Sequence, residues 1–294
     1  MRKNFAPGAS LPVDFLRTAS DRGVVYPAKG IPPLRQAQGS GFQKRMLILA
    51  IDTSGQSGGI TLAEAEAGSF RVIESAAIAG GTFSAQLIPT LAALLKKHGY
   101  GVKDLGGFAA ASGPGSFTGL RVGLSAIKGL AETLHKPIAT VSVLEALASL
   151  ADRDGKIAAA MDAGRKEVFL GIYQKHANEN SSRAEQSVEN SGPQLGTHSN
   201  NGLTKQREEL LTQQDFLATV STERPAVIVT SDAALAELAA ASHSAVVVLT
   251  PPGSEVIARI GAAKLLAGET VSVEALDANY LRRSDAEIFF KGNR

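Results

Sequence analysis

The 294-residue chain contains no cysteine. This absence excludes a disulfide framework, cysteine-ligated zinc and thiol catalysis, and it agrees with the reducing environment of the cytoplasm. The sequence also lacks any apolar run that approaches the roughly 20 residues needed to cross a bilayer. Its formal net charge is only +2, which gives no argument for a dedicated nucleic-acid binder. We therefore expect a cytoplasmic protein without a membrane span.

The histidines lack the spacing of metal ligands. No His-x-x-His or His-x-x-x-His pair occurs among the five histidines, which are His98, His135, His176, His198 and His243. The sequence therefore predicts no histidine-based metal site, whereas carboxylates would still be able to hold a hydrated magnesium ion.

Two segments differ in character from the rest of the chain. Residues 1–45 are interrupted by prolines, and no helical or alternating period persists between them. We interpret this segment as a disordered extension, with the ordered protein beginning at Met46. Asn, Ser, Gln, Glu and Gly dominate residues 175–206, which predicts a polar surface insertion. Residues 286–294 form a tail.

The remaining sequence predicts an α/β protein with two similar halves, residues 46–148 and 149–285. The apolar segment Ile157–Gly164 and the strand after it repeat the strand, Asp turn and strand at the start of the first half. Asp162 therefore occupies the position that Asp52 has in the first half. The predicted strands are 46–51, 60–64, 70–77, 107–111, 137–143, 157–164, 168–173, 225–230 and 245–249, and the predicted helices are 84–98 (capped by Ser84), 117–134, 144–150, 232–241 and 254–267.

Two turns of the first half have the composition of anion-binding loops. In the first, Asp52-Thr53-Ser54-Gly55 follows a strand and offers hydroxyl and N–H groups to a phosphate, or a carboxylate to magnesium. In the second, Gly113-Pro114-Gly115-Ser116 leads into a helix whose free N–H groups point above the turn. Each turn can also be explained as a hydrogen-bonded structural connection, and for the Asp52 turn this is the favoured explanation. Neither contains the Gly-Lys-Ser/Thr of a Walker A loop.

The helix that follows Ser116 carries apolar residues on two sides. One side is a stripe of Leu120, Leu124, Ile127, Leu130 and Leu134. The other is a nearly bare strip of Gly119, Gly123 and Ala126, along which another backbone can pack. A helix that needs close neighbours on two sides is a candidate for a partner surface. Arg121, one turn into this helix, is either a solvated charge or a contact for an anion.

Four motifs in this order resemble the bacterial TsaB family, also called YeaZ. They are Met46-Leu-Ile-Leu-Ala-Ile-Asp-Thr-Ser, Gly113-Pro-Gly-Ser-Phe-Thr-Gly-Leu-Arg-Val-Gly-Leu, Met161-Asp-Ala-Gly-Arg-Lys-Glu-Val and Tyr280-Leu-Arg. The resemblance implies the fold of the actin, sugar-kinase and heat-shock-chaperone superfamily, with two βββαβα halves of which the second is degenerate. It also implies a non-catalytic subunit of the complex that forms N6-threonylcarbamoyladenosine at position 37 of tRNAs reading codons that begin with A.

The resemblance further implies partners and sites. The expected partners are a TsaD-like catalytic subunit, a TsaE-like ATPase, tRNA through the complex and, as an alternative, a second copy of the chain. The expected interface residues are Leu87, Leu91, Leu94, Leu95, Leu120, Arg121, Leu124 and Ile127, and the expected remnants of phosphate loops are Asp52, Thr53, Ser54, Gly113, Gly115 and Ser116. No tightly bound cofactor is expected, although a nucleotide could occupy a composite site shared with partners. The alternative function is an ATP-dependent small-molecule kinase or ATPase.

Overall fold

A computed structural model describes residues 45–176, 202–279 and 281. Most of the predicted N-terminal extension, most of the polar insertion and the predicted tail lie outside these residues. The chain separates into one unit of residues 1–42 and a second, compact unit of residues 43–294. All of the described residues lie in the second unit.

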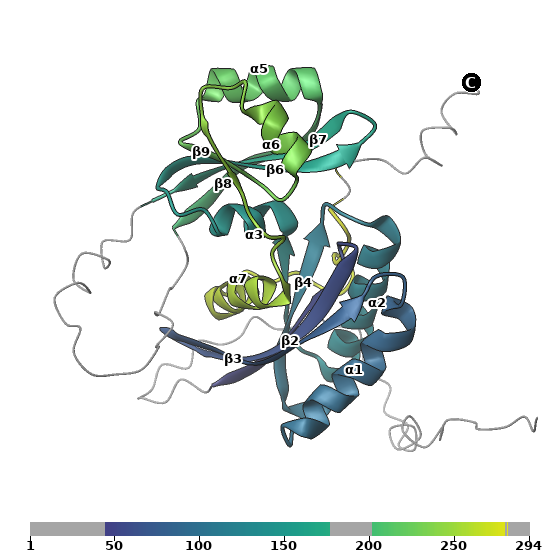
Figure 1. Cartoon of the computed structure of the whole chain (residues 1–294). Coiled ribbons are helices and arrows are strands. Elements are labelled where there is room, and N and C mark those ends of the chain that lie inside the picture. Colours follow the sequence, from purple (N-terminus) through teal and green to yellow (C-terminus); the bar gives the residue numbers. More distant parts are fainter. Residues whose placement is uncertain (1–44, 177–201, 280, 282–294) are drawn as a thin grey trace, which may run out of the picture. The chain divides into compact units, whose positions relative to one another are not determined.

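The first half is built on a five-stranded mixed sheet with the order β3-β2-β1-β4-β5 (Figure 1). β2 pairs antiparallel with β1 and β3, whereas β4 pairs parallel with β1 and β5. Its elements are β1 (Met46–Asp52), β2 (Ser57–Glu66), β3 (Ser69–Ala79), α1 (Phe83–Lys97), a short 3-10 helix (Val102–Asp104), β4 (Leu105–Gly113), α2 (Phe117–Leu134), β5 (Ile138–Ser142) and α3 (Val143–Ser149).

The second half repeats this arrangement in a sheet with the order β10-β9-β6-β7-β8. Its elements are β6 (Gly155–Gly164), β7 (Glu167–Lys175), β8 (Leu203–Thr212), α5 (Gln213–Glu223), β9 (Val227–Thr230), α6 (Ala233–Ala239), β10 (Ala245–Val248) and α7 (Ser254–Ala267). Because the strand order and the parallel and antiparallel pairings match between halves, the predicted duplication is confirmed. The second sheet retains every strand of the repeat.

The last helix of each half covers the sheet of the other half. In α7, Ile257 and Ala258 pack with Ile48 of β1, and α7 contacts β1, β2, β4 and β5 (Figure 1). In α3, Leu144 packs with Tyr173 of the second sheet. The approach of α7 is close, because a Cβ on Gly261 would lie 2.3 Å from the Cβ of Ala109. This exchange of helices joins the two halves through apolar cores.

Two boundaries differ from the sequence prediction. Helix α1 begins at Phe83 after Thr82, not after Ser84, because the Thr82 carbonyl accepts the N–H groups of Ala85 and Gln86. The polar stretch that includes residues 203–206 is not wholly an insertion, since it contains the start of β8, and α5 follows directly. Charged residues in β8 and α5 interrupt the apolar pattern by which a strand or a helix is recognised in a sequence. Arg207 pairs there with Glu209 and Glu223, at 2.8 Å each, which allows a charged sequence to form an edge strand.

Candidate functional site

A cavity of about 1140 Å³ opens between the two halves. Its walls come from the β1–β2 turn (Ser54–Gln56), the loop and first turn of α2 (Pro114–Leu120), and the β6–β7 turn (Met161–Gly164). Asn279 and Leu281 of the C-terminal segment complete it. The two glycine- and hydroxyl-rich turns of the first half and the Asp162 turn of the second half therefore face one space.

The two candidate phosphate loops are bonded to each other. The backbone N–H of Ser116 donates to the carbonyl of Ser54 at 2.7 Å, and the Thr53 hydroxyl donates to the carbonyl of Gly119 at 2.7 Å. The Ser116 hydroxyl accepts the N–H of Gly119 and caps α2. These bonds support the interpretation of both turns as structural connections. Their role as remnants of phosphate loops stays a prediction.

Glycines make this close approach of α2 to the β1 turn sterically feasible. An added Cβ would lie 2.3 Å from the Ser54 carbonyl oxygen at Gly115, 2.0 Å from the Thr53 carbonyl oxygen at Gly119, and 2.4 Å from the Thr53 hydroxyl at Gly123. All three distances are far shorter than van der Waals contact. At Gly119 and Gly123, the bare strip that the sequence predicted for another backbone is thus occupied by Thr53 of the same half.

Asp52 supports its own turn and does not line the cavity. One carboxylate oxygen accepts the backbone N–H of Ser54 at 2.9 Å and the Ser54 hydroxyl at 2.6 Å. Burial raises the pKa of the Asp52 carboxyl, the bonds from Ser54 oppose this rise, and the nearby charge of Glu255 adds to it. A carboxyl held in this way is poorly placed to bind a hydrated metal ion in the cavity.

The raised pKa predicts how Asp52→Asn changes stability with pH. In the wild type, the protonated Asp52 carboxyl contributes to stability at low pH. This contribution is lost as the pH rises through the folded-state pKa of Asp52. Asparagine keeps an oxygen for Ser54 and carries no charge to bury. We therefore expect Asp52→Asn to have the higher melting temperature in mildly alkaline buffer, with a difference that shrinks as the pH is lowered.

Thermal unfolding over a pH series checks this prediction. Asp162→Asn is the matched control, because Asp162 occupies the equivalent turn of the second half with an exposed side chain that accepts the N–H of Gly164 at 3.1 Å. A stability difference for Asp52→Asn that stays constant across the series would contradict the prediction.

The cavity offers little side-chain charge to a phosphate. Among the described residues that line it there is no lysine, arginine or histidine, and Asp162 is the one ionisable group. Within the described part of the chain, no three His, Asp or Glu residues are placed to hold a metal ion. A polyphosphate bound here would have to depend on backbone N–H groups and hydroxyls. Binding of a nucleotide in a site shared with partners stays a prediction.

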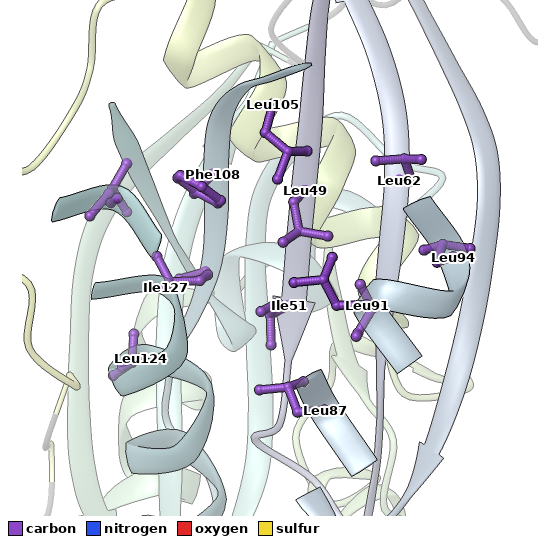
Figure 2. Close-up of a cluster of buried hydrophobic side chains, with 14 of the residues drawn as sticks. Leu49, Ile51, Leu62, Leu87, Leu91, Leu94, Leu105, Phe108, Leu124 and Ile127 are labelled. Carbon is purple, nitrogen blue, oxygen red and sulfur yellow. The ribbon is translucent and has the colours of Figure 1, made fainter. Parts of the chain in front are cut away.

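The packing places most of the predicted interface residues inside the first half, and their role in binding a partner stays a prediction. Apart from Arg121, the predicted residues are buried in the first-half core, where α1 and α2 lie against the sheet (Figure 2). They are Leu87, Leu91, Leu94, Leu95, Leu120, Leu124 and Ile127. They share one core cluster with strand residues such as Leu49, Ile51 and Phe108, and Figure 2 labels five of the seven: Leu87, Leu91, Leu94, Leu124 and Ile127. Leucines at helical spacing mark the sheet-facing side here, because an amphipathic helix buries its most apolar stripe first. Arg121 is exposed, and its guanidinium lies 3.8 Å from the centre of the Phe117 ring.

Sequence reasoning missed the surface that α1 does expose. No charged residue occurs between Phe83 and Leu95, although one side of this helix faces away from the core. Ile88 is 53% exposed, and Ala85, Pro89 and Ala92 are exposed beside it. We call this set the α1 outer face. Its signal in the sequence was the lack of charge at positions that lie off the leucine stripe.

Comparison with known proteins gives the family. A family model described as TsaD, tRNA N6-adenosine threonylcarbamoyltransferase, matches residues 76–289. The chain belongs to this family. The protein named TsaB of Bacillus subtilis (strain 168) is 38% identical over 130 residues, which cover 44% of this chain and 56% of that relative. TsaB of Escherichia coli (strain K12) is 34% identical over 96 residues, which cover 32% and 42%.

These relatives confirm the predicted membership in the TsaB (YeaZ) family. The chain spans about half the length of the curated relatives it matches. A crystal structure from Pseudomonas aeruginosa, described as an uncharacterized protein with similarity to peptidase YeaZ, has a TM-score of 0.58 at 24% identity. That alignment covers 81% of this chain and all of the other, and it supports the fold of the TsaB family with its duplicated halves. No helix among the described residues is long and apolar enough to span a membrane.

Proposed function

We propose that this chain is the TsaB subunit of the assembly that makes N6-threonylcarbamoyladenosine at position 37 of tRNA, and that it acts without catalysing a reaction itself. Family membership supports the pathway, since the relatives are named tRNA threonylcarbamoyladenosine biosynthesis proteins. The bonded loops, and the lack of a cationic side chain among the described residues that line the cavity, support a non-catalytic role. The cytoplasm, where tRNA is modified, is the expected compartment.

The observation that carries the proposal is the α1 outer face. A surface helix on a monomer normally exposes charged or polar side chains, whereas α1 exposes Ile88 among small apolar residues. Small side chains let another helix approach closely, and the absence of charge removes the penalty of burying one. This face suits a helix pair of a TsaD-like catalytic subunit. A TsaE-like ATPase and tRNA then join through the complex, and a second copy of this chain is the competing occupant.

The kinase or ATPase alternative has less support from the geometry. Transfer of a phosphoryl group depends on cations that neutralise the phosphates. The described residues that line the cavity supply none, and Asp52 is directed to Ser54. ATP turnover by the purified chain that disappears in Asp52→Ala would overturn the non-catalytic assignment.

Substitution of Ile88 tests the partner surface. We expect Ile88→Glu to weaken binding to the same organism's TsaD homologue by about 30-fold or more, because burying an unpaired carboxylate at an apolar contact costs at least about 2 kcal/mol. Co-purification and titration calorimetry of the full chain measure the loss. Binding as strong as in wild type would contradict the proposal, whereas unchanged TsaD binding with loss of self-association would assign the face to a homodimer.

Val248→Glu is the matched control for this experiment. Val248 lies in β10 of the second half and is 54% exposed, which equals the exposure of Ile88 within a percentage point. The control therefore adds the same charge at an equally exposed β-branched residue, away from α1 and α2. We expect it to leave binding to the TsaD homologue unchanged.

A further inference from the structure

The C-terminal segment is anchored on the first half. The N–H of Val271 donates to the carbonyl of Ile138 in β5 at 2.9 Å, and Leu276 and Ala278 are buried in the first-half core. The N–H of Asn279 then donates to the carbonyl of Ser112 in β4 at 2.6 Å. By its backbone, this segment is therefore part of the first half as far as Asn279.

The side chain of Asn279 crosses to the second half. Its amide nitrogen donates to a carboxylate oxygen of Glu208 in β8 at 2.8 Å. The other carboxylate oxygen of Glu208 accepts the hydroxyl of Tyr173 in β7. Only 4% of the Glu208 side chain is exposed, with Lys205 at 3.9 Å as its ion-pair partner, and Tyr173 is fully buried. Both oxygens of this buried carboxylate accept hydrogen bonds. Removing either donor would leave an oxygen without its partner and lower the stability of the protein.

Tyr173 also contacts the first half, because its side chain packs in one apolar cluster with Leu144 of α3. Burial raises the pKa of the Tyr173 hydroxyl far above its usual range, and Glu208 adds to this, so the hydroxyl stays a donor. The tyrosine ring passes over Gly171, where an added Cβ would lie 2.6 Å from a ring carbon.

We propose that Asn279, Glu208 and Tyr173 form a clasp that locks the two halves in one relative orientation and so holds the cavity at a set width. The hydrogen bonds run from Asn279, whose backbone is held to β4 of the first half, to Glu208 of the second half, which also accepts the hydroxyl of Tyr173. Asn279 itself lines the cavity, so the clasp lies in its wall. The protein then acts as a rigid platform and does not close around a ligand. This inference is independent of the proposed function.

Exchanging donor and acceptor across the clasp tests it. Asn279→Asp places a second carboxylate against Glu208, and adding Glu208→Gln restores one amide donor and one carboxylate acceptor in reversed order. Because the chain has no cysteine, spin labels at Glu132→Cys in α2 and Ser221→Cys in α5 report one distance between the halves. We expect a narrow distance distribution in the labelled full chain, its loss in Asn279→Asp, and its return in Asn279→Asp with Glu208→Gln.

A neighbouring glutamate provides the control. Glu209→Gln removes the same charge from the same strand, at a residue that pairs with Arg207 at 2.8 Å and not with Asn279. We expect the distance distribution between the two labels to stay broad in Asn279→Asp with Glu209→Gln. A narrow distance distribution in Asn279→Asp alone would overturn the clasp. So would an equal return of the narrow distribution when Glu208→Gln or Glu209→Gln is added. If Asn279→Asp fails to fold, recovery of soluble protein and of its circular dichroism by Glu208→Gln but not by Glu209→Gln supports it, and any other pattern overturns it.

Discussion

Gly119→Ala is expected to lower the free energy of unfolding by about 3 kcal/mol, at the upper end of the usual cost of overpacking. The added Cβ would lie 2.0 Å from the carbonyl oxygen of Thr53. That oxygen belongs to the backbone of a buried turn, which is held to α2 by the hydrogen bonds of Thr53 and Ser54. The helix cannot move away from this oxygen without breaking these hydrogen bonds. The clash also cannot be relieved by a change of rotamer, because an alanine side chain has none.

Chemical denaturation of the full chain measures this effect against Gly129→Ala. Gly129 lies in the same helix, is exposed, and has no atom within 4 Å of an added Cβ. There alanine improves helix propensity, and we expect a gain of about 0.5–1 kcal/mol. If Gly119→Ala were as well tolerated as Gly129→Ala, α2 would not be packed on the Thr53 turn as described.

Leu91→Ala is expected to lower the free energy of unfolding by about 3 kcal/mol, within the range for truncation of a buried leucine. Leu91 is 3% exposed and packs in the first-half core between α1 and the sheet (Figure 2). The cost combines the lost transfer of apolar atoms from water with the cavity that remains. A residue that served only as a partner contact would show no such loss in the isolated chain.

Ile88→Ala is the companion variant for this measurement. It removes a similar apolar side chain one turn away at 53% exposure, and we expect the free energy of unfolding to change by less than about 0.5 kcal/mol. Denaturant melts of both variants therefore distinguish the core side of α1 from its outer face. Equal stability of Leu91→Ala and Ile88→Ala would contradict this division of the helix.

The motifs and the repeat pattern were sufficient to predict the family and the duplicated halves. The glycine stretch from Gly113 and the restart at Ile157 each depend on local order along the chain, which a single sequence displays directly. The strand β8 was missed because Lys205, Arg207 and Glu208 conceal any alternation. Strand β8 is stabilised by contacts with β7, α5 and the C-terminal segment, which the spacing of residues in the sequence does not reveal.

The sequence by itself determined that α2 has an apolar stripe and a strip of glycines, and that α1 carries leucines at helical spacing. Only the tertiary structure decided what each side touches, because periodicity gives the direction of a side chain around a helix but not the identity of its neighbour. The leucines face the sheet, and Gly119 and Gly123 face Thr53. The same limit applies to Asn279, since its partner Glu208 lies 71 residues earlier in the chain. Pairing over such a separation depends on the packing of the two halves, so no local pattern encodes it.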